Sequence, residues 1–345
     1  MGVHLNNIWY IIIVILWVGF FVLEGFDFGV GMLHQFVGRT DAERRVCVNT
    51  IGPVWDGNEV WLIVAGAAIF AAFPGWYATM FSAFYLAMVL ILLALIVRGL
   101  SFEYGRKIDD PRWRATWRWS LTIGSALIPL LLGTALGDLL HGLPIDSSHN
   151  YTGSFWGLLV PFGLYTGLTL TVLSVLVGVT YLTLKTGGAL HERVGRLSGR
   201  IGWIAVLIVF GWLTWSHVGI GSNGFVPSPL DALALVAVIA AALFAEADAE
   251  GWAFASAATA IGSVVGSIFF DLFPKVMVST TNASYSLTVA NTASPSYTLK
   301  VMSVVAIVFF PLVLLYQGWS LYIFRKRVST PPATESSTEM AGQPG

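Results

Sequence analysis

The chain has 345 residues, of which 56% are hydrophobic and only 11% are charged, whereas a soluble domain carries about 25% charged residues. This composition excludes a soluble globular protein, and the abundant aromatic residues exclude a disordered one. The net charge of −1 predicts no nucleic-acid partner, and the single cysteine, Cys47, excludes an internal disulfide or a multi-cysteine metal site.

Nine apolar segments are long enough to cross a hydrocarbon core of roughly 30 Å as helices. In chain order they cover residues 8–33, 53–73, 76–100, 119–140, 156–184, 201–218, 230–247, 251–270 and 299–324. We therefore expect an all-α integral membrane protein with nine transmembrane helices, in which residues 1–327 form the membrane domain. The segment 328–345 is rich in Pro, Ser, Thr and Glu and has no apolar periodicity, which predicts a disordered tail.

Positive charge lies almost entirely on one side of the predicted membrane. All 18 Lys and Arg residues except Lys275 and Lys300 fall at or after the ends of the first, third, fifth and ninth segments. Because cytoplasmic loops are enriched in Lys and Arg, we expect the N-terminus outside the cell and the C-terminus, with its tail, in the cytoplasm.

Four carboxylates and one arginine converge near the predicted cytoplasmic side. Glu24 and Asp27 lie in the inner third of the first segment, Asp56 and Glu59 open the second, and Arg98 lies in the last turn of the third. A carboxylate at membrane depth costs several kcal/mol unless it is paired or hydrated, so the cluster predicts a proton-entry site. The alternative is electrostatic: Arg98 and a helix N-terminus would neutralise the acids and hold three helices in register.

The histidines do not form a haem site that the sequence can identify. Of the six, only His217 lies within a predicted span, near its outer end, whereas an axial haem ligand lies at membrane depth. Asp138 and Asp271 are expected near outer helix ends, where water reaches them. The chain is therefore expected to bind no haem of its own.

Small residues recur at a spacing of four in two of the predicted helices. The pairs are Gly25 and Gly29 in the first, and Gly262 and Gly266 in the eighth. This spacing lets helix backbones approach closely, which predicts a compact bundle.

Two motifs resemble the second subunit of cytochrome bd-type quinol oxidases. They are GFDFGVGML at residues 25–33 and GPVWDGNEVWL at residues 52–62. Further similar segments run to about residue 325, among them DPRWR at residues 110–114. The chain departs from many members of that family at Arg118, where they carry an acidic residue between two tryptophans, and locally at residues 104–107.

The resemblance implies a two-chain enzyme of the bacterial plasma (inner) membrane, which oxidises quinol and reduces dioxygen to water with cytoplasmic protons. It implies a fold of two four-helix bundles plus one peripheral helix, and b-type and d-type haems on the partner, subunit I. Small accessory subunits and a quinone or lipid bound to this chain are left open. In the family this subunit supports the assembly and lines part of the proton path.

Residue roles follow from the same resemblance. Asp56 is the family-matched proton-path residue, helped by Glu59 and tuned by Glu24, Asp27 and Arg98. Trp55 and Trp61 are expected to pack the subunit interface and exclude water.

Two other functions compete with this interpretation. Acids on Gly-interrupted helices also suit an ion-coupled secondary transporter, but transporter sites lie near the membrane midplane, whereas these acids cluster at the inner edge. A purely scaffolding subunit without a proton role fits the sequence equally well.

Overall fold

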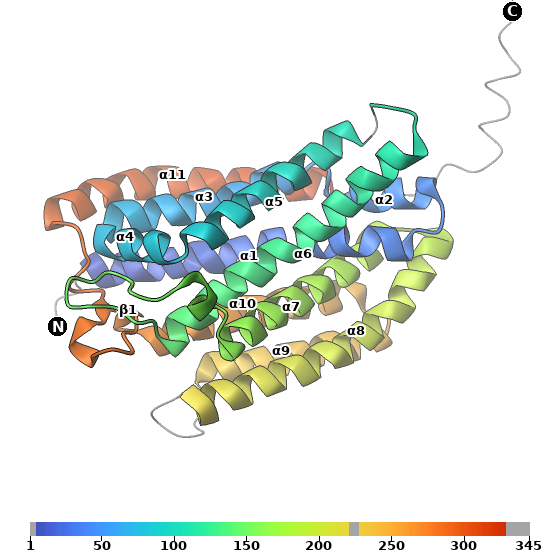
Figure 1. The fold of residues 1–345 in the computed structure, drawn as a ribbon. Coiled ribbons are helices and arrows are strands. Elements are labelled where there is room, and N and C mark those ends of the chain that lie inside the picture. Colours follow the sequence, from blue (N-terminus) through green and yellow to red (C-terminus); the bar gives the residue numbers. More distant parts are fainter. Residues whose placement is uncertain (1–4, 106, 221–227, 329–345) are drawn as a thin grey trace, which may run out of the picture.

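The structure is a computed structural model that describes residues 5–105, 107–220 and 228–328. Figure 1 shows helices lying side by side in an elongated bundle. Of the tail predicted to be disordered, 328–345, only Val328 lies within the described residues, where its N–H donates to the Lys185 carbonyl at 2.7 Å.

The first half of the chain forms six helices. They are α1 (Leu5–Val37), α2 (Asp41–Ile51), α3 (Trp55–Ala72), α4 (Pro74–Ala83), α5 (Tyr85–Tyr104) and α6 (Pro111–His141). The second half contains α7 (Pro161–Lys185), α8 (Gly188–Trp215), α9 (Pro229–Glu246), α10 (Glu250–Leu272) and α11 (Ser296–Ile323).

Short elements complete the connections. Two 3-10 turns cover Phe155–Leu158 and Ala283–Tyr285, and a π-helical turn, Ser216–Ile220, extends α8. The strands β1 (Lys275–Met277) and β2 (Leu287–Thr288) pair antiparallel between α10 and α11.

The expectation of an all-α protein that crosses the membrane several times is confirmed. Within the described residues, eight helices are long and apolar enough to span a bilayer, and the number rises to nine if α2 and α3, bent by 47°, count as one span. The expected spans correspond to α1, α3, α5 to α11, with boundaries that differ by several residues at most ends.

Two short helices are not predicted by the apolar pattern. Helix α2 falls in an expected loop and begins with a capping box, in which Thr40 and Glu43 each bond the other's backbone N–H. The spacing of Thr40 and Glu43 is the sequence signal for such a start. The expected third span is also divided at Phe84, so that α4 is separate from α5. Pro74 fits the first turn of α4, where its missing N–H needs no partner.

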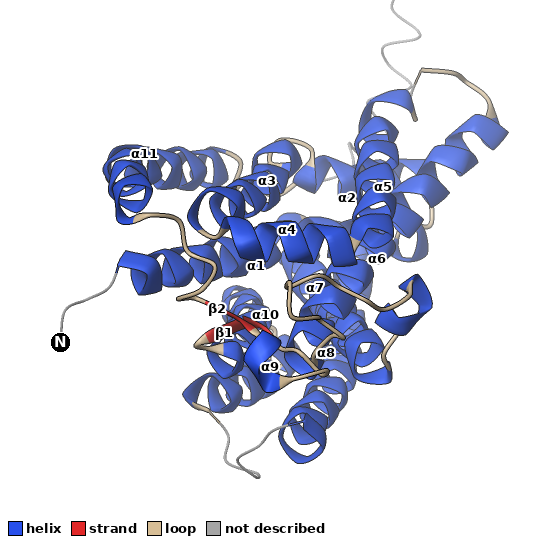
Figure 2. Cartoon of the chain, turned by 60° about the vertical axis from the view of Figure 1, so that its left-hand side comes forward, coloured by secondary structure: helices blue, strands red, loops and turns tan. Residues whose placement is uncertain are grey.

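Helix α1 lies at the centre of the arrangement and packs against α3, α6, α7 and α10. Helices α1, α3, α5 and α6 form one group and α7 to α10 a second, and the two groups meet along α1, α6 and α7. Figure 2 shows α11 at the edge of the first group, next to α3. Only Leu299 and Gln317 of α11 are buried, so this helix is peripheral.

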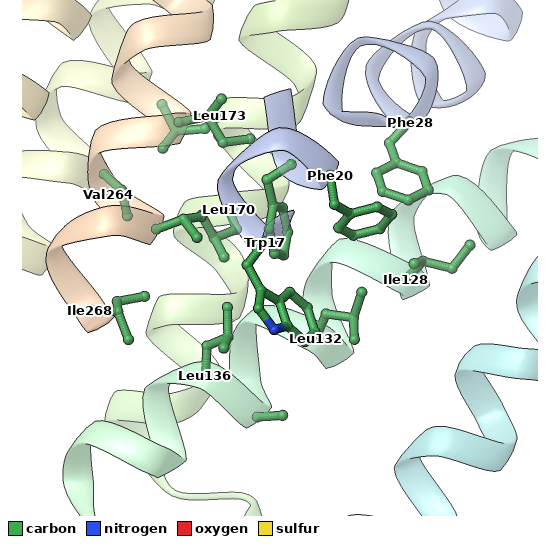
Figure 3. Packing of buried hydrophobic residues seen from close by; sticks show 14 of the residues in the cluster. Trp17, Phe20, Phe28, Ile128, Leu132, Leu136, Leu170, Leu173, Val264 and Ile268 are labelled. Atoms are coloured by element: carbon green, nitrogen blue, oxygen red, sulfur yellow. The ribbon is translucent and has the colours of Figure 1, made fainter. Parts of the chain in front are cut away.

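The core around α1 is built from large apolar side chains. Figure 3 shows Trp17, Phe20 and Phe28 of α1 packed among residues of α6, α7 and α10, including Leu132 and Leu170. All five side chains are at most 4% exposed. This packing holds α1 rigidly, and therefore fixes the positions of the two carboxylates that it carries.

Small residues permit the closest contact between helices. A Cβ added to Gly178 of α7 would lie 2.6 Å from the Val30 backbone nitrogen and closer still to Gly29, so α1 and α7 touch backbone to backbone. A Cβ on Gly262 would meet Val18 and Val22 of α1 at 3.2–3.3 Å. The predicted close approach of helix backbones is therefore confirmed at Gly29, whereas Gly262 packs against side chains. Gly25 and Gly266 make ordinary van der Waals contacts, with the nearest atoms 3.4 Å from an added Cβ.

Candidate functional site

Three helices place four ionisable side chains together inside the first helix group. Helix α1 contributes Glu24 and Asp27, α3 contributes Glu59, and α5 contributes Arg98. Glu24, Asp27 and Arg98 are fully buried, and the Glu59 side chain is 20% exposed. The convergence predicted from the sequence is thus present for these four residues.

Arg98 is the centre of the cluster. One of its terminal nitrogens, Nη1, lies 2.6 Å from Glu24 Oε1 and 3.3 Å from Glu59 Oε2. The guanidinium carbon lies 5.0 Å from the centre of the Phe28 ring and 5.7 Å from that of Phe102. Because a buried guanidinium needs both counter-ions and polarisable neighbours, these contacts stabilise the Arg98 side chain inside the bundle.

Asp27 accepts a hydrogen bond from the side-chain amide of Asn58 and makes no ion pair with Arg98 within 4.0 Å. Asn58 Nδ2 donates to Asp27 Oδ2 at 2.7 Å, and Gln317 Nε2 donates to Asn58 Oδ1 at 2.6 Å. All three side chains are buried. The chain of hydrogen bonds therefore joins α1, α3 and the peripheral α11.

Asp56 is placed differently from the other predicted carboxylates. It lies in the first turn of α3 and is exposed, and it makes no ion pair within 4.0 Å among the described residues. Since Glu59 follows one turn later on the same helix, the two are neighbours along the helix surface. The proposed role of Asp56 stays a prediction.

The two tryptophans predicted to pack and exclude water both pack against neighbouring helices of this chain. Trp55 is half-buried and stacks on Phe102, with ring centres 4.7 Å apart. Trp61 is 7% exposed and lies over Gly19, where an added Cβ would be 2.5 Å from its ring. Both rings therefore cover the α1–α3–α5 region from within this chain, and their part in a subunit interface stays a prediction.

Asn58 and Gln317 are the site residues that the sequence analysis does not identify. Each has a signal: Asn58 lies inside the motif at residues 52–62, and Gln317 interrupts an apolar run. Neither is ionisable, so a search for buried charge passes over them. Only the packing of α11 against α3 shows that they meet.

The expectation that water reaches Asp138 is wrong. Asp138 is fully buried on α6, and neither carboxylate oxygen has a hydrogen-bond partner among the described residues. Asp271 is exposed, as expected. It lies near His217 and Asp231, whose Nε2 and Oδ2 atoms are 2.9 Å apart.

The described histidines lie near helix ends or in a connection between helices. In the last turn of α1, His34 is bound through Nδ1 to the Gly31 carbonyl at 2.8 Å. His217 is held by Asp231, and the other described histidines lie in a loop or near helix ends.

The fold and the buried cluster define a class: a membrane protein with ionisable groups inside its helical bundle, which includes redox and proton-handling complexes as well as transporters. The family model for cytochrome bd terminal oxidase subunit II matches residues 5–324. The chain belongs to that family. It is a subunit of an oxidoreductase complex and a multi-pass protein of the bacterial inner membrane.

Individual relatives are similar over nearly their whole length. The chain is 42% identical to cytochrome bd ubiquinol oxidase subunit 2 of Bacillus subtilis, over 94% of this chain and 97% of that protein. It is 37% identical to cytochrome bd-I ubiquinol oxidase subunit 2 of Escherichia coli K12, over 94% and 95%. Its fold is similar to a chain of the bd oxidase from Geobacillus thermodenitrificans, with a TM-score of 0.72 at 15% identity over 92% of this chain and 97% of that one.

Proposed function

We propose that this chain is the haem-free second subunit of a two-chain quinol oxidase that reduces dioxygen to water with cytoplasmic protons. The names of the Bacillus subtilis and Escherichia coli relatives as ubiquinol oxidase subunits support this assignment. The b-type and d-type haems, which supply the redox chemistry, are assigned to the partner subunit. This chain supports that partner and forms part of the proton path.

The buried cluster carries the proposal for the proton path. Exposure decreases in steps from Asp56 at the surface, through Glu59 at 20%, to Glu24 at 0%. Two carboxylates, Glu24 and Glu59, share one guanidinium, so one of them can hold a proton while the other keeps its ion pair with Arg98. In this proposal a proton enters at Asp56, moves to Glu59 one turn further along α3, and reaches Glu24 beside Arg98. Asp27, fixed by Asn58, completes the cluster.

The test uses the intact two-chain complex in inverted membrane vesicles. Asp56→Asn and Glu24→Gln are made separately, and Glu192→Gln, an exposed carboxylate of α8 outside the cluster, is the matched control. The two site variants are expected to slow oxygen consumption and proton uptake in parallel, by on the order of a hundredfold, the usual contribution of a positioned proton-transfer group. If both variants assemble and keep the wild-type rates, the scaffolding alternative is correct. Family membership leaves the transporter alternative without support.

The proposed orientation has a direct test as well. The single cysteine, Cys47, is fully buried, so background labelling by a membrane-impermeant maleimide is low. Ser148→Cys, exposed in the α6–α7 connection, is expected to react from outside intact cells. Glu192→Cys is expected to react only after the cells are opened, and the reverse result would invert the topology.

A further inference from the structure

A cavity of about 330 Å³ lies where α1 and α5 end and α2 and α6 begin, on the side that carries most of the positive loops. This volume is at the lower end of the range typical for small-ligand sites. Figure 2 shows α2 beside α5 at this end of the molecule. Phe102 lines the cavity and also faces Arg98, so the cavity is next to the buried cluster but separate from it.

Positive charge dominates the lining of the cavity. Its charged side chains are Arg44 and Arg45 of α2, Arg114 and Arg118 of α6, and two carboxylates, Asp41 and Asp109. Asp41 lies 2.8 Å from Arg44 and 3.3 Å from Arg118, so one carboxylate serves two guanidinium groups. The partner of Arg114 is Asp109, which is 94% exposed, and water weakens that pair. The lining therefore has an unbalanced positive charge.

Several buried donors in the lining have no acceptor. The Nε–H groups of Arg44, Arg114 and Arg118 and the indole N–H of Trp117 have no hydrogen-bond partner in the part of the chain that the structure describes. Buried polar atoms are almost always paired, so four such donors around one cavity indicate a missing acceptor. An anion with several oxygens in the cavity would supply acceptors to guanidinium groups of both α2 and α6, which line it.

His34 adds a different requirement. It is 1% exposed and lines the same cavity. Its Nδ1 lies 2.8 Å from the Gly31 carbonyl, so Nδ1 carries the proton and Nε2 is left as an acceptor, with no partner among the described residues. Nε2 can accept from a hydroxyl. The arginines disfavour an ammonium group in that place, because like charges repel.

We propose that this cavity binds the headgroup of an anionic phospholipid of the cytoplasmic leaflet, with its phosphate on the arginines and Trp117 and a headgroup hydroxyl on His34. Basic pockets between helices on the cytoplasmic side are suited to such headgroups. Val48, Phe102 and Leu121, which also line the cavity, provide an apolar contact for the start of the acyl chains. Inorganic phosphate has anionic oxygens and a hydroxyl like the lipid headgroup, but it has no apolar part to contact these three side chains.

The test uses the purified two-chain complex in nanodiscs of phosphatidylcholine with increasing phosphatidylglycerol. Native mass spectrometry counts the phospholipids that stay bound after detergent release. Wild type is expected to retain phosphatidylglycerol in preference to phosphatidylcholine. Equal retention of the two lipids overturns the proposal, and this comparison needs no substitution.

Variants locate the site. Arg44→Gln and Arg118→Gln are each expected to weaken phosphatidylglycerol retention about fivefold, the effect of one basic residue near a membrane surface. Arg118→Lys keeps the positive charge but lacks the planar guanidinium, so it is expected to retain more phosphatidylglycerol than Arg118→Gln and less than wild type. Arg112→Gln is the matched control, because Arg112 is exposed on the same helix and does not line the cavity.

Two outcomes contradict the assignment. If Arg44→Gln and Arg118→Gln assemble and retain phosphatidylglycerol as wild type does, the lipid binds elsewhere. If millimolar inorganic phosphate displaces the lipid completely, the cavity is a site for the free anion. Neither outcome depends on oxygen consumption, so the lipid site and the proton path are tested independently.

Discussion

Replacing Arg98 by methionine is expected to destabilise the protein strongly, because a buried ion pair is broken. Arg98 and Glu24 are both fully buried with their charged atoms 2.6 Å apart, and Glu59 lies 3.3 Å from the same nitrogen. Methionine fills much of the volume of the arginine stem but leaves Glu24 as a buried charge without a partner. Removal of one member of a buried ion pair typically costs about 3–5 kcal/mol.

A double-mutant cycle isolates the pair from packing effects. Glu24→Gln alone should cost less, about 1–3 kcal/mol, because Arg98 keeps its contact with Glu59. In the double variant the fully buried carboxylate of Glu24 is absent and only the partly exposed Glu59 lacks its partner, so part of the Arg98→Met loss should be recovered. We expect a coupling of about 1–3 kcal/mol, which is in the range measured for groups in one buried network.

The free energy of unfolding is measured by SDS titration of the complex in mixed micelles, followed by circular dichroism. Arg112→Met is the control, because Arg112 is exposed at the start of α6 and should change stability by less than about 0.5 kcal/mol. If Glu24→Gln and Arg98→Met are additive to within about 0.5 kcal/mol, the buried ion pair does not stabilise the contact between α1 and α5.

Three further predictions concern other parts of the bundle, each measured by the same unfolding titration. Gly178→Ala should lower the free energy of unfolding by about 1–3 kcal/mol, because its Cβ would overlap the α1 backbone. Gly195→Ala is the control: its Cβ would meet nothing within 4 Å, so it should stabilise α8 by up to about 1 kcal/mol. Similar effects at both positions would contradict the close contact between α1 and α7. Asp138→Asn should leave the free energy of unfolding unchanged or raise it, because the carboxylate has no ion pair or hydrogen bond among the described residues. A large loss of stability would show that the carboxylate has a partner. Gln317→Leu should lower the free energy of unfolding by about 1–3 kcal/mol, because it leaves Asn58 Oδ1 unpaired. It should also speed amide hydrogen exchange in α11. Unchanged exchange would show that the contact between the two amides does not hold that helix.

Local properties of the sequence determined the fold class and most of the helices. Runs of apolar residues identify membrane-crossing helices because the hydrocarbon core imposes their length, whatever their neighbours are. The motifs at residues 25–33 and 52–62 pointed to the family, and the family model covers residues 5–324. The cost of a buried charge was enough to select Glu24, Asp27, Glu59 and Arg98, and the structure brings these four together.

The pairing of side chains was decided only by the tertiary structure. Asn58 and Gln317 are 259 positions apart, and their contact depends on how α11 lies against α3. The position of Asp138 near a helix end predicted contact with water. In the structure α6 packs against Gly163 of α7, and Asp138 is completely buried. The basic cavity likewise requires α2, a helix with too little apolar surface to be recognised as a span, to fold back beside α5 and α6. Hydropathy is a property of a segment taken alone, whereas burial and pairing depend on which segments meet.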